Sequence, residues 1–367
     1  MRDQRAEALA QILVRYSTRV AKGEVCVIQS STSAEALVLA VYEEVLRAGG
    51  LPIVQLSPEG AAAAFYALAS EEQLDWISPP ATWQAENADV RIAIMGDVNS
   101  RELSQVDPKL QARVARARKP LMETSMRRSA TGEHRWSLTL FPTHAYASEA
   151  GMSLSAYEDF YYAACLATDR DPLTAWQRQS DEVKRLAEWM EGREEVRISG
   201  PGTDVTLNVA GRTFIPCVGE HNMPDGEFFT GPLEDSAEGE IAFSFPATYG
   251  GREVAGVRFR FEGGRVVDAS AERGEDFLLE ILDTDDGARR LGELGIATNY
   301  GIATATKEIL LDEKIGGTVH LAIGMSYPET GGTNDSAVHW DMVCDLREGG
   351  SITVDGIELQ RDGRFVV

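Results

Sequence analysis

Histidines and acidic residues gather in the last quarter of the chain, within segments that alternate apolar and polar residues. The clearest segment contains His339 and Asp341, two residues apart. Successive side chains of a strand point to opposite faces, so this pair points one way while Val338, Trp340 and Met342 point to a packed face. An imidazole and a carboxylate on one face are ligands that divalent transition metals take. The segment therefore predicts a metal site.

Three more side chains are candidate ligands of the same site. His320 lies between two apolar residues, so a strand would turn its imidazole away from them. Glu293 stands among apolar residues and close glycines, where a carboxylate needs a cation or several donors. Glu227 follows an Asp-Gly turn signal and opens a β-prone run. We expect these side chains to converge with the first pair.

Six blocks, in this order and local context, carry a family resemblance. They are Asn222-x-Pro224-x-Gly226-Glu227-x-x-Thr230-x-Pro232, Gly292-Glu293-x-Gly295, Asp312-Glu313-Lys314 leading to His320, Tyr327-Pro328, Gly331-Gly332 and His339-Trp340-Asp341. Together they resemble the thermophilic metallo-aminopeptidases of the aminopeptidase T type. The resemblance covers most of the chain.

The resemblance implies a dinuclear exopeptidase site in the C-terminal domain. Five residues match metal-ligand positions of the family: Glu227, Glu293, His320, His339 and Asp341. Glu313 is a further candidate ligand that stands seven residues ahead of His320, and it is a possible general base if it binds no metal. Glu293, which is central in the motif order, is expected to bridge two divalent ions. Zinc, cobalt, manganese and magnesium all suit such a nitrogen and oxygen site.

Tyr327 matches an active-centre tyrosine of the family. Its hydroxyl could donate a hydrogen bond to the developing oxyanion, or its ring could line the pocket.

The expected reaction is metal-dependent hydrolysis of the N-terminal bond of short peptides with a free N-terminus, by a metal-activated water. Members form homodimers, so we expect one here. Phe228, Phe229 and Trp340 either favour apolar substrate side chains or belong to the core.

Two other functions stay open. His320, His339 and Asp341 also fit the two-histidine, one-carboxylate triad of mononuclear non-haem iron oxygenases, and a ring-cleaving dioxygenase of pyridine diols has a similar fold. The number of carboxylates favours hydrolysis, because Glu227 and Glu293 would be superfluous for one iron. A binding protein with a relic site is disfavoured by the retention of every ligand type in order.

Composition limits the classes of partner. The chain has 367 residues, a length that suggests two domains. Its formal net charge of −23 disfavours binding to the phosphate backbone of nucleic acid. No secretory signal or membrane-spanning run is visible, so we expect a cytoplasmic protein. The four cysteines are scattered and form no CxxC pair.

The predicted fold is an α/β N-terminal domain with a largely parallel sheet, followed by a β-rich α+β metal-binding domain. Apolar runs at 25–28, 51–56 and 90–95 alternate with helical patterns. A capping-box pattern at Thr32-Ser33-Ala34-Glu35 predicts a helix that ends at Gly49-Gly50. Short β-like runs begin after a helical region that ends near residue 192. We therefore place the domains at 1–190 and 191–367.

Overall fold

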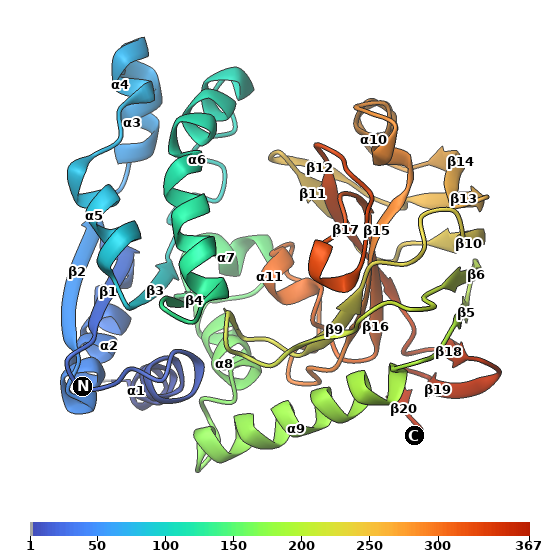
Figure 1. Ribbon diagram of the computed structural model, residues 1–367, viewed down its shortest axis with the longest axis horizontal. Coiled ribbons are helices and arrows are strands. Elements are labelled where there is room, and N and C mark those ends of the chain that lie inside the picture. Colours follow the sequence, from blue (N-terminus) through green and yellow to red (C-terminus); the bar gives the residue numbers. More distant parts are fainter. Residues whose placement is uncertain (1–2) are drawn as a thin grey trace. The chain divides into compact units, whose positions relative to one another are not determined.

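Figure 1 shows the computed structural model, which describes residues 3–367. Two compact units divide the chain. The first unit consists of the chain up to Trp176 together with residues 219–224. The second unit consists of residues 177–218 and 225–367. Helix α9 (Pro172–Met190) starts in the first unit and continues into the second.

The first unit is built on a parallel five-stranded sheet with the order β2-β1-β3-β4-β8. Its strands are β1 (Val25–Ser31), β2 (Leu51–Ser57), β3 (Val90–Met95), β4 (Arg135–Leu140) and β8 (Asn222–Met223). Its helices are α1 (Gln4–Gln11), the π-helix η1 (Ile12–Ser17), η2 (Thr32–Ala34), α2 (Glu35–Ala48), α3 (Ala61–Leu68), α4 (Glu71–Asp75), α5 (Pro79–Asn87), α6 (Pro108–Ala130), α7 (His144–Glu149) and α8 (Leu154–Ala164). The predicted α/β domain with a parallel sheet is confirmed.

The start of helix α2 differs from the prediction. Gly49 ends the helix in a left-handed conformation (φ 85°), as expected. The N-cap is Ala34, however, and no side chain caps the helix, so the predicted capping box is wrong. The hydroxyls of Ser31 and Ser33 donate instead to the carbonyl of Gly96 after β3. These two bonds tie the end of β1 to the end of β3.

The second unit is β-rich, as predicted, and its sheets are antiparallel. One sheet has the order β14-β13-β10-β6-β5-β18-β19-β20, another has the order β17-β16-β15-β9-β7, and β11 pairs with β12. The strands are β5 (Glu195–Gly200), β6 (Thr203–Asn208), β7 (Ile215–Cys217), β9 (Glu227–Thr230), β10 (Glu238–Ala242), β11 (Ala247–Tyr249), β12 (Arg252–Val254), β13 (Arg258–Glu262), β14 (Arg265–Ser270), β15 (Leu291–Ala297), β16 (Thr318–Gly324), β17 (His339–Asp345), β18 (Ser351–Val354), β19 (Ile357–Arg361) and β20 (Arg364–Phe365). The shorter helices are α10 (Glu275–Leu282), η3 (Gly287–Arg289), α11 (Ile309–Asp312) and η4 (Pro328–Thr330).

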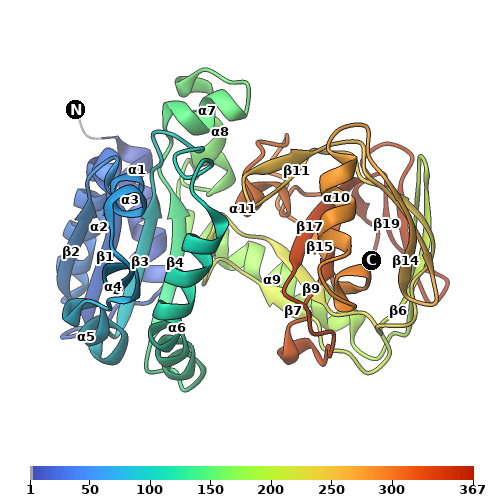
Figure 2. The ribbon, with the colours of Figure 1, turned by 90° about the horizontal axis from the view of Figure 1, so that it is seen from above.

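Figure 2 shows α9 and α10 beside the strands of the second unit. Buried side chains of these two helices and of the two large sheets form one apolar core. The five-stranded sheet contributes alternate residues to this core: Phe228, Leu294, Leu321, Trp340 and Met342, each at most 3% exposed. Phe228 and Trp340 are therefore core residues. Because side chains alternate, the residues between them project from the opposite face of the sheet. Among residues 3–367, no helix has the length and apolar character required to span a bilayer.

Candidate metal centre

Three neighbouring strands present candidate ligands on the face opposite the core. In the ladder of β15, β16 and β17, Glu293 is paired with Ala322, which is paired with Asp341. His320 lies two positions before Ala322 on β16, and therefore on the same face. His339 begins β17, opposite Gly324. The strand β9, next to β15, adds Glu227 from its first position.

A glycine makes room for the first imidazole. Gly295 is paired with His320 across β15 and β16. A Cβ at this glycine would lie 2.0 Å from both Cε1 and Nε2 of the imidazole. The space that His320 occupies therefore depends on the absence of a side chain, which explains the glycine two residues after Glu293.

The two imidazoles meet opposite oxygens of one carboxylate. His320 Nε2 lies 3.2 Å from Glu293 Oε1, and His339 Nε2 lies 3.5 Å from Glu293 Oε2. Glu227 Oε2 is 3.5 Å from His320 Nε2 at one end, and Asp341 Oδ2 is 3.6 Å from His339 Nε2 at the other. Ligand atoms of Glu293, His339 and Asp341 all lie within 4.8 Å of one another. Five predicted site residues are thus brought together.

Backbone carbonyls orient both imidazoles. His320 Nδ1 lies 3.0 Å from the carbonyl oxygen of Glu313, and His339 Nδ1 lies 2.8 Å from that of Met325. A carbonyl oxygen only accepts, so each Nδ1 carries the proton and donates it. In the neutral tautomer, Nε2 is then left with its lone pair directed at the carboxylates. Metal-binding histidines are held by this kind of outer contact.

The acidic groups of the cluster fit cations. Glu227 Oε2 and Asp341 Oδ1 are buried and have no hydrogen-bond partner among the described residues. Burial alone would lower the pKa of His320, but the carboxylates of Glu227 and Glu293 raise it to about 10. Burial, together with the charges of Glu293 and Glu313, raises the pKa of Asp341 to about 7. Without a metal, protons thus offset part of the buried negative charge.

Glu313 lies at the edge of the cluster, and its neighbour Lys314 was not predicted as a site residue. The Glu313 carboxylate is bonded to Lys314 Nζ at 2.5 Å, and Nζ also lies 2.9 Å from Glu227 Oε1. Asp225 adds a third carboxylate at 3.7 Å. A lysine in a short charged run between the apolar pair Leu310-Leu311 and Ile315 was the signal that could have identified it.

The Tyr327 ring packs against the second imidazole. Its centroid lies 5.1 Å from that of His339 and 5.5 Å from that of Phe229, both in edge-to-face geometry. Phe229 is therefore near the site, unlike Phe228. Burial, together with the charges of Glu293 and Asp341, raises the pKa of Tyr327 well above its usual range. The phenol thus stays protonated and is available as a donor.

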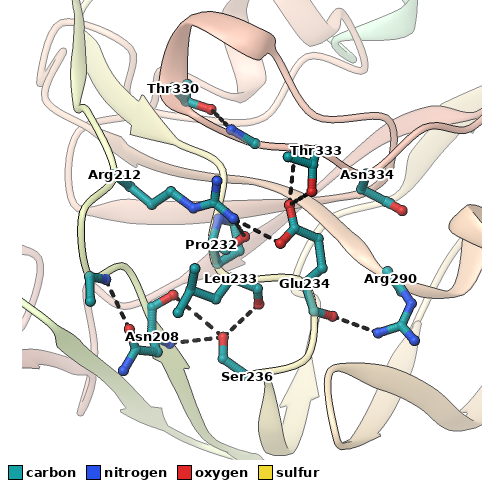
Figure 3. Close-up of polar contacts among 12 residues, drawn as sticks. Asn208, Arg212, Pro232, Leu233, Glu234, Ser236, Arg290, Thr330, Thr333 and Asn334 are labelled. Carbon is teal, nitrogen blue, oxygen red and sulfur yellow. Dashed lines mark hydrogen bonds and ion pairs between the residues drawn. The ribbon is translucent and has the colours of Figure 1, made fainter.

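A set of polar contacts fixes the loop that follows Tyr327 (Figure 3). Glu234 Oε1 accepts hydrogen bonds from the backbone N–H of Thr333 at 2.7 Å and from its hydroxyl at 2.8 Å. Glu234 Oε2 pairs with Arg212 at 2.8 Å, and the Arg212 side chain is 7% exposed. Thr330 Oγ1 donates to the Tyr327 carbonyl at 2.7 Å. These contacts position Tyr327, and none of them involves a candidate metal ligand.

Asp285 performs the same task for the segment that precedes His339. Its carboxylate accepts hydrogen bonds from Ser336 Oγ and from the N–H groups of Ala337 and Ala288. The hydrogen bond from the Ala337 N–H, and then those from Ser336 and Ala288, lower the pKa of Asp285. The acidic run around Asp285 is a turn that anchors the strand carrying His339, and no local pattern in the sequence indicates this pairing.

Comparison with known proteins identifies similar chains over nearly the whole length. The sequence pattern of the thermophilic metalloproteases (M29) matches residues 2–365. Aminopeptidase T of Thermus thermophilus is 28% identical over 98% of this chain and 98% of its own. Aminopeptidase 2 of Geobacillus stearothermophilus is 31% identical over 71% of this chain and 70% of its own.

Two solved structures share the fold. The wild-type AmpT structure from Thermus thermophilus superimposes with a TM-score of 0.84 at 27% identity, covering 99% of both chains. The structure of 2,5-dihydroxypyridine dioxygenase from Pseudomonas putida KT2440 gives a TM-score of 0.60 at 14% identity, covering 99% of this chain and 97% of that chain. The second likeness concerns the fold alone.

We expect Gly295→Ala to displace the His320 imidazole, because the new Cβ would lie 2.0 Å from two ring atoms. Such overpacking typically costs about 1–3 kcal/mol of unfolding free energy, and zinc affinity should fall with it. Thermal denaturation and zinc titration measure both effects. Gly200→Ala is the matched control, because its Cβ would lie 3.4 Å from the nearest atom. Wild-type zinc affinity in Gly295→Ala would refute the packing argument.

We expect metal uptake to release protons. The pKa of His320 is about 10 in the metal-free protein, so at neutral pH its imidazole must lose a proton before Nε2 binds a metal. The apparent zinc affinity should therefore rise with pH, by up to about tenfold per unit for one proton. Calorimetry in buffers of different protonation enthalpy counts the protons, with exposed His144→Gln as control. Uptake without proton release at pH 7 contradicts this expectation.

Proposed function

Because the chain belongs to the M29 family of thermophilic metalloproteases, we propose that it is a metal-dependent aminopeptidase that hydrolyses the N-terminal bond of short peptides. The observation that carries this proposal is the convergence of two imidazoles on opposite oxygens of Glu293. Aminopeptidases of several bacteria are similar to it over most of their length.

In the proposed centre, two divalent ions would share the Glu293 carboxylate. Glu293 Oε2, His339 and Asp341 would hold one ion, and Glu293 Oε1, His320 and Glu227 the other. The orphaned oxygens of Glu227 and Asp341 support this division, since each lies at one end of the cluster. When bound, such ions lower the pKa of a water molecule and polarise a carbonyl group. Zinc, cobalt, manganese and magnesium are all compatible with these ligands.

The remaining residues would bind and orient the peptide. Tyr327, held between His339 and Phe229, can donate its hydroxyl proton to the oxyanion that develops on the scissile carbonyl. The surplus of carboxylates attracts the positively charged N-terminus of a peptide. Glu313 is less suited to be a ligand or a base than the sequence suggests, because its carboxylate is bonded to Lys314.

The oxygenase alternative has weaker support. A single iron held by His320, His339 and Asp341 leaves Glu293 without a task, although this carboxylate lies between both imidazoles. The likeness to the dioxygenase, at 14% identity, concerns the fold. The homodimer and the cytoplasmic location stay predictions that sedimentation and cell fractionation would test.

We expect chelator-stripped protein to lose hydrolysis of leucine p-nitroanilide and zinc or cobalt to restore it as two ions bind per chain. Glu293→Gln should prevent this recovery, because an amide cannot supply two anionic oxygens to two ions. Metal analysis and initial rates measure the two effects. A single tightly bound iron with oxygen uptake on a pyridine diol would support the oxygenase instead.

We expect Tyr327→Phe to lower kcat about 100- to 1000-fold, the usual effect of removing one oxyanion donor. Metal content should stay unchanged, because the ring packing against His339 and Phe229 is retained. Steady-state kinetics gives kcat and KM separately, and Tyr66→Phe in the first unit is the matched control. A change in KM alone would assign Tyr327 to the pocket wall.

A further inference from the structure

Lys314 is a buried ammonium at one end of the ligand cluster, and its side chain is 1% exposed. Its Nζ lies 2.9 Å from Glu227 Oε1, 2.5 Å from Glu313 Oε1 and 3.7 Å from Asp225 Oδ1. Resting on the metal centre proposed above, we infer that Lys314 is a built-in cation that makes the two ion positions unequal. The Glu293–His339–Asp341 position binds an ion tightly, and the Glu227–His320 position binds one weakly.

The backbone holds this ammonium in place. Lys314 follows α11, and its N–H donates to the carbonyl of Leu311. Its own carbonyl accepts from the N–H of Asn299 at 3.2 Å, and the Asn299 side chain donates to the carbonyl of Asp225 at 2.8 Å. Lys314 and Asp225 are thus both bonded to Asn299, which fixes the backbone that carries the ammonium beside this carboxylate.

The ammonium competes for the ligand that the second ion needs. Lys314 holds Oε1 of Glu227, and only Oε2 is left facing His320. A carboxylate that already balances one cation attracts a second less strongly, and the two cations repel each other in a buried site. The Glu227–His320 position therefore loses affinity on two accounts.

Lys314 also takes the nearby acidic groups away from metal binding. Ligand atoms of Cys217, Asp225 and Glu227 lie within 4.8 Å of one another, close enough for a metal. Two of these three residues, Asp225 and Glu227, already have carboxylate oxygens 3.7 Å and 2.9 Å from Lys314 Nζ. The Lys314 ammonium is the cation that balances the carboxylates of Asp225, Glu227 and Glu313.

The opposite end of the cluster has a different composition. Asp341 Oδ2 faces His339 Nε2 at 3.6 Å, and Asp341 Oδ1 has no hydrogen-bond partner among residues 3–367. Both oxygens of this carboxylate are thus available to an ion. Among residues 3–367, the ion pair of Asp341 is with His339, and no lysine or arginine pairs with it. The negative charge of Asp341 would therefore be balanced by the metal ion that it binds.

The test is calorimetric titration of metal-stripped full-length protein with zinc, with a competing chelator to resolve the tighter step. Wild type should show two steps, the second weaker than the first by about 10- to 100-fold. Lys314→Met, which keeps the length of the side chain without its charge, should strengthen the second step by a similar factor and leave the first unchanged. Lys314→Gln keeps a donor and should act in the same direction if the methionine variant folds poorly. Lys184→Met, on the exposed face of α9, is the matched control.

A second readout is independent of stoichiometry. Without its lysine, metal-free Lys314→Met leaves buried carboxylates unbalanced and should melt lower, so zinc should raise its Tm by more than that of wild type. Two equal steps in wild type, or a second step that Lys314→Met and Lys314→Gln leave unchanged, would overturn the inference and leave the metal centre intact. Failure of wild type to bind zinc at all would refute the proposed function as well.

Discussion

The concentration of negative charge in a buried site is the constraint on which the second unit depends. Glu227 and Glu293 are almost inaccessible to solvent, and Asp341 and Glu313 lie beside them. Bringing carboxylates together in this way is costly unless cations or donors accompany them. Three kinds of positive charge can balance these carboxylates: protons on His320 and Asp341, the ammonium of Lys314, and the proposed metal ions. The proposed metal ions would balance the part of this charge that the protons and the ammonium leave.

The antiparallel sheet satisfies this demand at little structural cost. Alternation places apolar side chains in the core and acidic or imidazole side chains on the other face of the same strands. Leu294 and Glu293 are adjacent in sequence, yet one lies in the core and the other in the cluster. Stability and chemistry thus use separate faces of one element, so each face can carry residues that would be unsuitable on the other.

Local patterns in the sequence predicted much of this arrangement. Period-two alternation predicted that Trp340 is buried and that His339 and Asp341 share a face, and the structure agrees. The parallel sheet of the first unit followed from its alternating strands and helices. Strand register, however, decides which residues face one another, and single-strand patterns do not encode register.

Long-range polar contacts were beyond sequence reasoning for a different reason. Lys314 reaches Glu227, 87 positions earlier in the chain, and Asp285 reaches Ala337, 52 positions later. Neither pairing has a local signature. The capping box predicted at Thr32 was wrong: no side chain caps α2, and the neighbouring hydroxyls of Ser31 and Ser33 donate to the carbonyl of Gly96, just after β3. Local propensity competes with tertiary bonding, and tertiary bonding decides.

The backbone carbonyls that orient the imidazoles have an evolutionary consequence. Glu313 and Met325 hold the two histidines through main-chain oxygens, a contribution that any residue able to adopt the same backbone conformation can make. Related enzymes can therefore diverge at both positions while the ring orientation stays the same. A search for invariant residues would find the ligands and overlook the groups that aim them.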